Sequence, residues 1–229
     1  MIESRIVSIQ VGMPATHGAD AVSSKPWQSG IFKVPAQGRV FLDTHNLAGD
    51  GQQDLKNHGG PYRAVLAYSA AHYPLWEAEL RPLLSEGVAF GYGAFGENFT
   101  VTGYDEDTIH IGDIIAVGEA RLQVSQPRMP CWKLARRWGL KDLTARVDEK
   151  AWGGWYHRVI ETGHVQAGDE YRVIDRLYPD LPIKRLYQLM VERETDTAAY
   201  HKLAGMFDIL TPSWRTHYGH LAATHSSPA

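Results

Sequence analysis

The chain has 229 residues, 44% of them hydrophobic and 21% charged, and its formal net charge is −3 at pH 7. Such a chain is long enough for one domain with an appendage or for two small domains. The negative balance argues against a general electrostatic grip on nucleic acid, and no run of about twenty apolar residues is present to span a membrane. One cysteine cannot form an internal disulfide, and the first residues lack the pattern of a signal peptide. We therefore expect a cytoplasmic protein with neither nucleic-acid nor membrane partners.

Short strands separated by glycine-bearing loops are predicted over the first half of the chain. Apolar and β-branched runs favour strands over residues 5–11, 31–34, 39–42, 64–68 and 99–103. Residues 13–30, 47–61 and 91–98 are predicted to be loops, and a loop as long as the second is usually functional or disordered. Ser69 is a suitable N-cap for a helix reaching about Leu84, in which Pro74 belongs to the first turn or marks a kink.

A hairpin, two helices and two further strands are predicted up to residue 174. The hairpin joins 109–117 to 121–126, the helices cover 133–138 and 143–147, and the strands cover 156–161 and 171–174. About eight or nine short strands with little βαβ alternation favour a closed or nearly closed mixed β-barrel with helical insertions. We therefore predict a mainly β domain over residues 1–176, with its core at about 31–175.

The spacing of apolar residues becomes helical beyond Leu177-Tyr-Pro-Asp-Leu-Pro182. Positions 183, 186, 187, 190 and 191 fall on one face of a helix, and the same spacing recurs over 200–207 and 214–221. Thr211 and Pro212 supply a cap and a proline at the first helical position. Residues 181–222 are thus predicted to form a separate three-helix unit.

The one cysteine lies in a setting that favours its reactive form. Pro127 and Pro130 stiffen the backbone before Cys131, and the positive neighbours Arg128 and Lys133 favour the thiolate, which attacks electrophiles and binds metals. A predicted strand leads in and a predicted helix leads out, so we expect Cys131 at a strand-to-helix turn. A buried, unreactive cysteine is the alternative that this pattern leaves open.

Two glycine-bearing loops have the composition of ligand sites. Lys56-Asn-His-Gly-Gly-Pro-Tyr-Arg63 combines glycines, whose N–H groups can converge on an anion, with the donors Lys56, His58 and Arg63. This loop suits a phosphate or a polar heterocycle, and a solvated turn with incidental charges is the alternative. In the second loop, Glu97 and Asn98 can orient a purine-like substrate or simply form a turn.

Four motifs, in their order along the chain, resemble those of the MOSC domain family, the domain found at the C-terminus of molybdenum cofactor sulfurases. They are Lys56-Asn-His-Gly-Gly-Pro-Tyr-Arg-Ala64, Phe95-Gly-Glu-Asn98, Ile111-Gly-Asp113 and Ser125-Gln-Pro-Arg-Met-Pro-Cys-Trp-Lys133. The resemblance is nearest to the bacterial YiiM-like branch, in which a helical unit called the 3-alpha domain follows, here over residues 181–222. Tyr62 stands where the family usually carries an acidic residue.

The resemblance implies a β-barrel that binds the molybdenum cofactor, which is molybdenum held by a pterin dithiolene, with Cys131 as the metal ligand. The residues that it implies for cofactor binding are Lys56, His58, Gly59, Gly60, Arg63, Asn98 and Arg128. It also implies the reduction of small N-hydroxylated substrates such as 6-N-hydroxylaminopurine, with electrons from an external flavoprotein or cytochrome-type donor. Cys131, Glu97 and His58 are then the expected catalytic residues, with Glu97 first and His58 second as the acid for the departing oxygen.

Two other functions stay open at this point. A cofactor carrier or sulfur-delivery module would bind the pterin in the same pocket without redox turnover, and its helical unit would dock a recipient enzyme. A thiol-nucleophile enzyme would pair Cys131 with a histidine that the fold brings close. The three-helix unit can have any of three roles: docking a partner, closing over the site, or covering an edge of the barrel.

Overall fold

The computed structural model describes residues 4–225, and its largest element is a mixed sheet of eight strands. The strands are β1 Ile6–Val11, β2 Ala15–His17, β3 Trp27–Ser29, β4 Val34–Pro35, β5 Val40–Leu42, β6 Val65–Ser69, β7 Phe99–Val101, β8 Ile114–Val117, β9 Ala120–Pro127, β10 Trp155–Glu161, β11 Gly163–Val165 and β12 Arg172–Asp175. The large sheet has the order β12-β8-β9-β10-β6-β7-β1-β4, in which only β6 and β7 pair in parallel. Two small sheets, β11-β5 and β2-β3, stand beside it.

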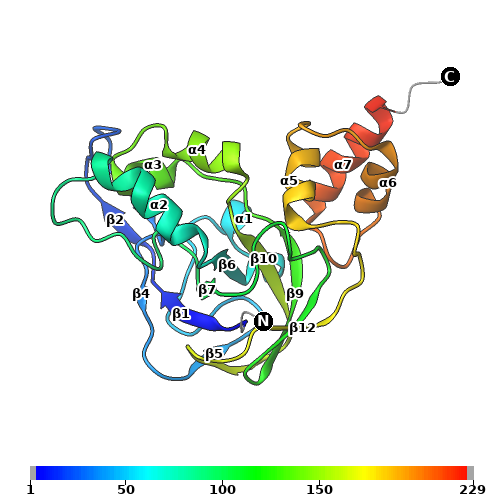
Figure 1. Ribbon diagram of the computed structural model, residues 1–229, viewed down its shortest axis with the longest axis horizontal. Coiled ribbons are helices and arrows are strands. Elements are labelled where there is room, and N and C mark those ends of the chain that lie inside the picture. The colour runs from blue at the N-terminus through cyan, green and yellow to red at the C-terminus, as the bar shows by residue number, and fades with distance from the viewer. Residues whose placement is uncertain (1–3, 226–229) are drawn as a thin grey trace.

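Apart from the short α1, which lies between them, the helices form two groups at opposite ends of the molecule (Figure 1). They are α1 Leu55–His58, α2 His72–Leu80, α3 Lys133–Trp138, α4 Leu143–Lys150, α5 Ile183–Met190, α6 Thr197–Ala204 and α7 Pro212–His225, with 3-10 turns η1 Pro61–Arg63 and η2 Arg81–Leu83. One group consists of α2, α3 and α4. The other consists of α5, α6 and α7, which we call the helical unit.

The pairing of the described strands does not close the large sheet into a ring, because β12 and β4 stand at its two ends. Residues before β12 nevertheless bond to the start of β1: Ile6 N donates to Asp169 O (2.9 Å), and Gly168 N donates to Ile6 O (2.8 Å). These bonds bring the two sides of the sheet together. The mainly β fold with helical insertions and a C-terminal group of three helices is confirmed, while a closed barrel is not shown.

Three buried hydrophobic clusters hold these layers together. The first lies within the large sheet, and another is shared by α2, α3, α4 and the loop around Phe95. The helical unit has a cluster of its own, which reaches the sheet domain through Ile111. An amphipathic helix gains most of its stability from burying its apolar face, so each helix of the unit depends on the other two. The exact domain boundaries, 1–176 and 181–222, stay a prediction.

Several local predictions differ from the structure for identifiable reasons. The predicted loop 13–30 contains the hairpin β2–β3, whose strands Ala15-Thr-His17 and Trp27-Gln-Ser29 lack a run of apolar residues. β11 falls between the predicted strands 156–161 and 171–174, and at its first residue, Gly163, a Cβ atom would come within 2.7 Å of the Glu119 backbone. Close approach of two backbones therefore explains this glycine. Pro74 is the third residue of α2, within its first turn.

A buried histidine in β10 is expected to make the fold sensitive to acid. His157 is fully buried, with Nε2 2.6 Å from the Tyr171 hydroxyl, and burial lowers its pKa to about 3. The unfolded chain takes up this proton near pH 6.5 and the folded chain only near pH 3. The free energy of unfolding should therefore fall as the pH drops through that window, by up to about 1.4 kcal/mol per pH unit.

Urea denaturation between about pH 7 and about pH 4 measures this slope, and a His157→Gln variant provides the comparison because glutamine does not titrate. The free energy of unfolding should fall less steeply with decreasing pH in the variant, by up to about 1.4 kcal/mol per pH unit, even if the variant is less stable at neutral pH. Identical slopes in both proteins would contradict the role given to His157.

Candidate active site

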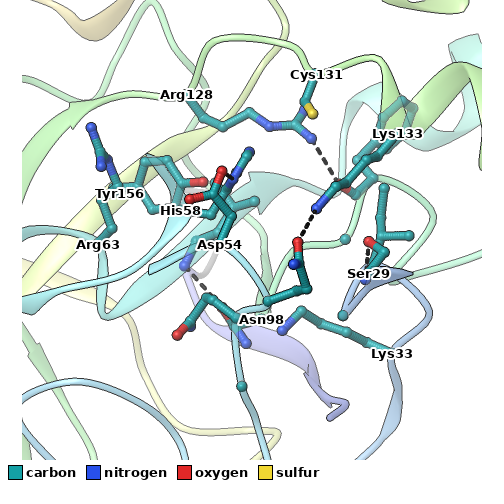
Figure 2. A pocket seen from close by; sticks show the side chains of 18 residues that line it. Ser29, Lys33, Asp54, His58, Arg63, Asn98, Arg128, Cys131, Lys133 and Tyr156 are labelled. Atoms are coloured by element: carbon teal, nitrogen blue, oxygen red, sulfur yellow. Dashed lines mark hydrogen bonds and ion pairs between the residues drawn. The ribbon is translucent and has the colours of Figure 1, made fainter. Parts of the chain in front are cut away.

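A cavity lined by many polar side chains forms where six segments of the chain meet. Residues 29–33, 51–63, 95–98 and 128–133 contribute, together with the strands β6 and β10. The lining residues are Ser29, Gly30, Ile31, Lys33, Gly51, Gln52, Gln53, Asp54, His58, Arg63, Leu66, Phe95, Gly96, Asn98, Arg128, Cys131, Lys133 and Tyr156. Figure 2 shows Cys131 and Arg128 at the top of the view and Lys33 at the bottom, with His58 and Asp54 at an intermediate height.

Five of the residues named from the sequence line this one cavity: His58, Arg63, Asn98, Arg128 and Cys131. They come from the two glycine-bearing loops and from the stretch around the cysteine, so the fold brings those three motifs together. Gly59, Gly60 and Glu97 are not among the lining residues. Lys56 belongs to α1, but its side chain lies outside the described residues.

Cys131 lies at a strand-to-helix turn, since β9 ends at Pro127 and α3 begins at Lys133. It is half-buried and lines the cavity. Its carbonyl oxygen accepts hydrogen bonds from Leu134 N (3.0 Å) and Thr144 Oγ1 (3.4 Å). The backbone that carries the thiol is thus held by residues of both α3 and α4.

The cavity is strongly positive. Lys33, Arg63, Arg128 and Lys133 line it, and Asp54 is the one carboxylate among the lining residues. Arg128 is 94% buried; its Nη2 donates to Phe95 O (3.3 Å), while its buried Nη1 has no hydrogen-bond partner within residues 4–225. A buried donor on a charged group is costly to leave unsatisfied. This arrangement therefore favours an anionic ligand.

Neutral hydrogen-bonding groups complete the wall near Cys131. Burial lowers the pKa of His58, and the positive charges of Lys133 and Arg128 lower it further, so its imidazole is uncharged at pH 7. Its Nδ1 lies 3.7 Å from Asp54 Oδ2. Burial raises the pKa of Tyr156, which keeps its phenol protonated. Both side chains can exchange hydrogen bonds with a bound ligand without changing the charge of the cavity.

Lys33 and Asp50 form a buried ion pair on the opposite wall. Asp50 also accepts from Gly12 N (2.9 Å) and from Asn98 Nδ2 (2.8 Å), while Asn98 Oδ1 accepts from Leu66 N (3.1 Å). Burial lowers the pKa of Lys33, and the Asp50 carboxylate opposes that shift. The network fixes the Asn98 amide and ties three segments of the cavity together.

Glu97 organises the second loop from within the core. Its carboxylate is fully buried and accepts hydrogen bonds from Gly93 N (2.6 Å), Phe95 N (3.1 Å), Thr100 Oγ1 (2.9 Å) and the Tyr73 hydroxyl. These contacts hold the turn that brings Phe95 and Asn98 to the cavity. The Glu97 carboxylate does not line the cavity, so its contacts position the loop and do not reach a bound ligand.

The two glycines of the first loop shape the backbone around the site. Gly60 has a φ of 90°, a left-handed conformation that glycine adopts without strain, and it leads directly into η1. A Cβ atom on Gly59 would lie 2.9 Å from Leu55 Cδ2 and 3.1 Å from Leu55 Cα. Both residues thus allow α1 to turn sharply into η1, which places His58 and Arg63 on one wall.

Sequence reasoning missed Lys33 and Tyr156 as lining residues. Lys33 lies just before β4, and no motif surrounds it in the sequence. The one sequence feature that could have indicated it is the glycine-bearing loop Asn46-Leu-Ala-Gly-Asp-Gly51, because this loop supplies its ion-pair partner Asp50. Tyr156 is part of β10, where Trp155, Tyr156 and His157 are all buried. An unbroken buried run does not reveal which side chain faces a cavity.

Two further features of residues 4–225 bear on function. No helix there is long and apolar enough to cross a membrane. No group of three or more histidine, cysteine, aspartate or glutamate side chains in the same range converges as a metal site.

Residues 54–172, which carry most of the cavity, match the MOSC domain, and the chain belongs to this family. Among curated relatives, the uncharacterized protein YflK of Bacillus subtilis is 37% identical over 213 residues, 93% of this chain and 92% of its own length. A protein named Reductase from Gibberella moniliformis is 34% identical over 166 residues, 72% of this chain but 29% of its own length. The solved structure of YiiM from Geobacillus stearothermophilus superposes with a TM-score of 0.75 at 30% identity, covering 96% of this chain and 99% of that one.

Proposed function

We propose that this protein is a molybdenum-cofactor-dependent oxidoreductase that reduces small N-hydroxylated compounds, with 6-N-hydroxylaminopurine as the model substrate. The observation that carries the proposal is the shared cavity, in which the one thiol of the chain stands with Arg63, Arg128 and Lys133. Membership of the MOSC family and a relative named Reductase support it.

The residues of the cavity fit such a cofactor chemically. Cys131 offers a thiolate, the soft ligand that suits a metal already bound by a dithiolene. The unpartnered Nη1 of Arg128 and the charges of Arg63 and Lys133 suit the phosphate and the polar edge of a pterin. When bound, the cofactor supplies two-electron chemistry at the metal.

The protein's own groups would bind the substrate and supply protons. Reduction breaks the N–O bond, forms an N–H bond and releases water, so two electrons and two protons are consumed. We assign the electrons to an external flavoprotein or cytochrome-type donor. His58 and Tyr156 line the cavity as neutral hydrogen-bonding groups. We assign His58 a relay role: one ring nitrogen accepts a proton that comes from solvent while the other donates its proton to the departing oxygen. Glu97 holds the loop behind them.

The test uses protein purified from a host that makes the molybdenum cofactor. We expect about one molybdenum and one pterin per chain, and conversion of 6-N-hydroxylaminopurine to adenine with a reduced viologen as the artificial donor. A protein that contains neither molybdenum nor pterin would refute the proposal. A loaded protein that never turns over, yet passes its cofactor to a recipient enzyme, would be a carrier instead.

A further inference from the structure

The turn that carries Arg63 is held from the side of the helical unit. η1 lies against β9 and β10, and the Ser125 hydroxyl on β9 donates to Tyr62 O (2.6 Å). The Tyr62 hydroxyl donates to Phe207 O (3.3 Å), between α6 and α7. The residue next to Arg63 is thus bonded to both the sheet and the helical unit.

A buried glutamine connects Arg63 to the same unit. Gln126 of β9 is 2% exposed, and in one orientation of its amide both the oxygen and the nitrogen have hydrogen-bond partners. In that orientation its oxygen accepts from Arg63 Nε (3.2 Å) and Trp214 Nε1 (3.1 Å), and its nitrogen donates to Thr211 Oγ1 (2.9 Å). Trp214 and Thr211 are themselves 4% and 6% exposed. Trp214 in the first turn of α7 and Thr211 just before this helix therefore fix the Gln126 amide, which in turn binds Arg63.

This arrangement matters because an arginine side chain has many rotamers, and fixing them costs free energy when a ligand binds. A hydrogen bond at Nε fixes the plane of the guanidinium and so the direction of its fork of donors. Trp214 is anchored in the core of the helical unit, so the oxygen of Gln126 has a fixed place.

We propose that Gln126, held by Trp214 and Thr211, is the positioning residue for Arg63, and that the helical unit thereby completes the anion-binding wall of the cavity. For its ligand this inference rests on the proposed function. The hydrogen-bond chain itself concerns only residues of this protein. The helical unit thereby has a role in ligand binding, which is distinct from docking a partner protein and from covering an edge of the sheet.

The experiment compares three changes in the full-length chain. Gln126→Met keeps the length of the side chain and removes both of its hydrogen-bonding roles, whereas Gln126→Glu restores the acceptor for Arg63 and Trp214. Tyr218→Phe is the matched control: it removes a buried hydroxyl of α7 that donates to Leu186 O (2.7 Å), away from Gln126. Thermal melts establish that each variant is folded at the temperature used.

Two readouts decide the outcome. In ¹⁵N-labelled apoprotein, the Nε–H signal of Arg63 should exchange slowly with water in the wild type, Gln126→Glu and Tyr218→Phe, and at least about 10-fold faster in Gln126→Met. In loaded protein, the rate of pterin loss on dilution should rise about 10-fold in Gln126→Met, as for other outer-shell partners, and stay within about 2-fold in Tyr218→Phe.

Equal effects in Gln126→Met and Tyr218→Phe on both readouts would overturn the inference, since they would reflect the stability of the helical unit alone. An unchanged Arg63 signal in Gln126→Met would also overturn it. If the wild type binds no pterin, the proposed function fails, and the exchange of the Arg63 signal still decides whether Gln126 holds Arg63.

Discussion

Replacing Cys131 by alanine is expected to abolish retention of molybdenum. The thiol is the only one in the chain, so no other thiolate can take its place. Molybdenum per chain should fall to less than about one tenth, and turnover of the N-hydroxylated substrate should fall by at least about 100-fold, beyond the range typical of outer-shell partners. Metal analysis by plasma mass spectrometry and a viologen-linked assay measure the two effects.

The fold should survive this change. Cys131 is half-buried, and the hydrogen bonds of its residue in the structure are made by its backbone carbonyl. We expect the free energy of unfolding to change by about 1 kcal/mol or less. Met129→Leu, in the same loop, is the matched control and should retain both metal and activity. Full molybdenum content in Cys131→Ala would contradict the ligand assignment, and lost activity at unchanged metal content would favour a thiol nucleophile paired with His58.

Replacing Glu97 by leucine is expected to cost about 3–5 kcal/mol of stability, the range for removing one partner of a buried charged network. The change leaves four donors without their acceptor. It also removes the negative charge that faces Arg137, whose half-buried guanidinium donates to Ile31 O and Gly93 O (2.6 Å each). Thermal unfolding should occur roughly 10 °C lower than in the wild type.

Glu97→Gln separates charge from shape at the same position. It keeps one acceptor oxygen, so we expect about half of the stability loss. Because the loop that Glu97 holds also carries Asn98, cofactor content should fall with stability in both variants. A Glu97→Leu protein that melts within about 2 °C of the wild type would show that the loop is held by its apolar packing instead.

The sequence predicted those elements whose ends are marked by local chemistry. α3 was expected over 133–138 and has those bounds, because Gly139 ends it in a left-handed conformation with a φ of 67°. The helical unit was predicted from the helical spacing of its apolar residues. β2, β3 and β11 contain no run of apolar residues, unlike the equally short β5, and their strand conformation depends on the strands with which they pair.

The candidate site likewise contains residues that local sequence indicates and residues that only the fold brings to it. Cys131, Arg128 and Arg63 come from motifs with unusual local composition, and the fold places them on one cavity. Lys33 reaches that cavity only because β4 lies at the edge of the sheet beside β1, a pairing that local sequence does not specify. The four donors around Glu97 likewise could not be predicted, because only the folded loop brings them together.

The wall that contains Ser29, Ile31 and Lys33 precedes residue 54, where the match to the MOSC domain begins. This wall and the wall that carries Cys131 therefore come from different stretches of the chain, which the Asp50–Asn98 hydrogen bond joins. Exchanging residues 29–33 between related chains is expected to alter which ligands the cavity accepts while leaving Cys131 and Arg128 in place.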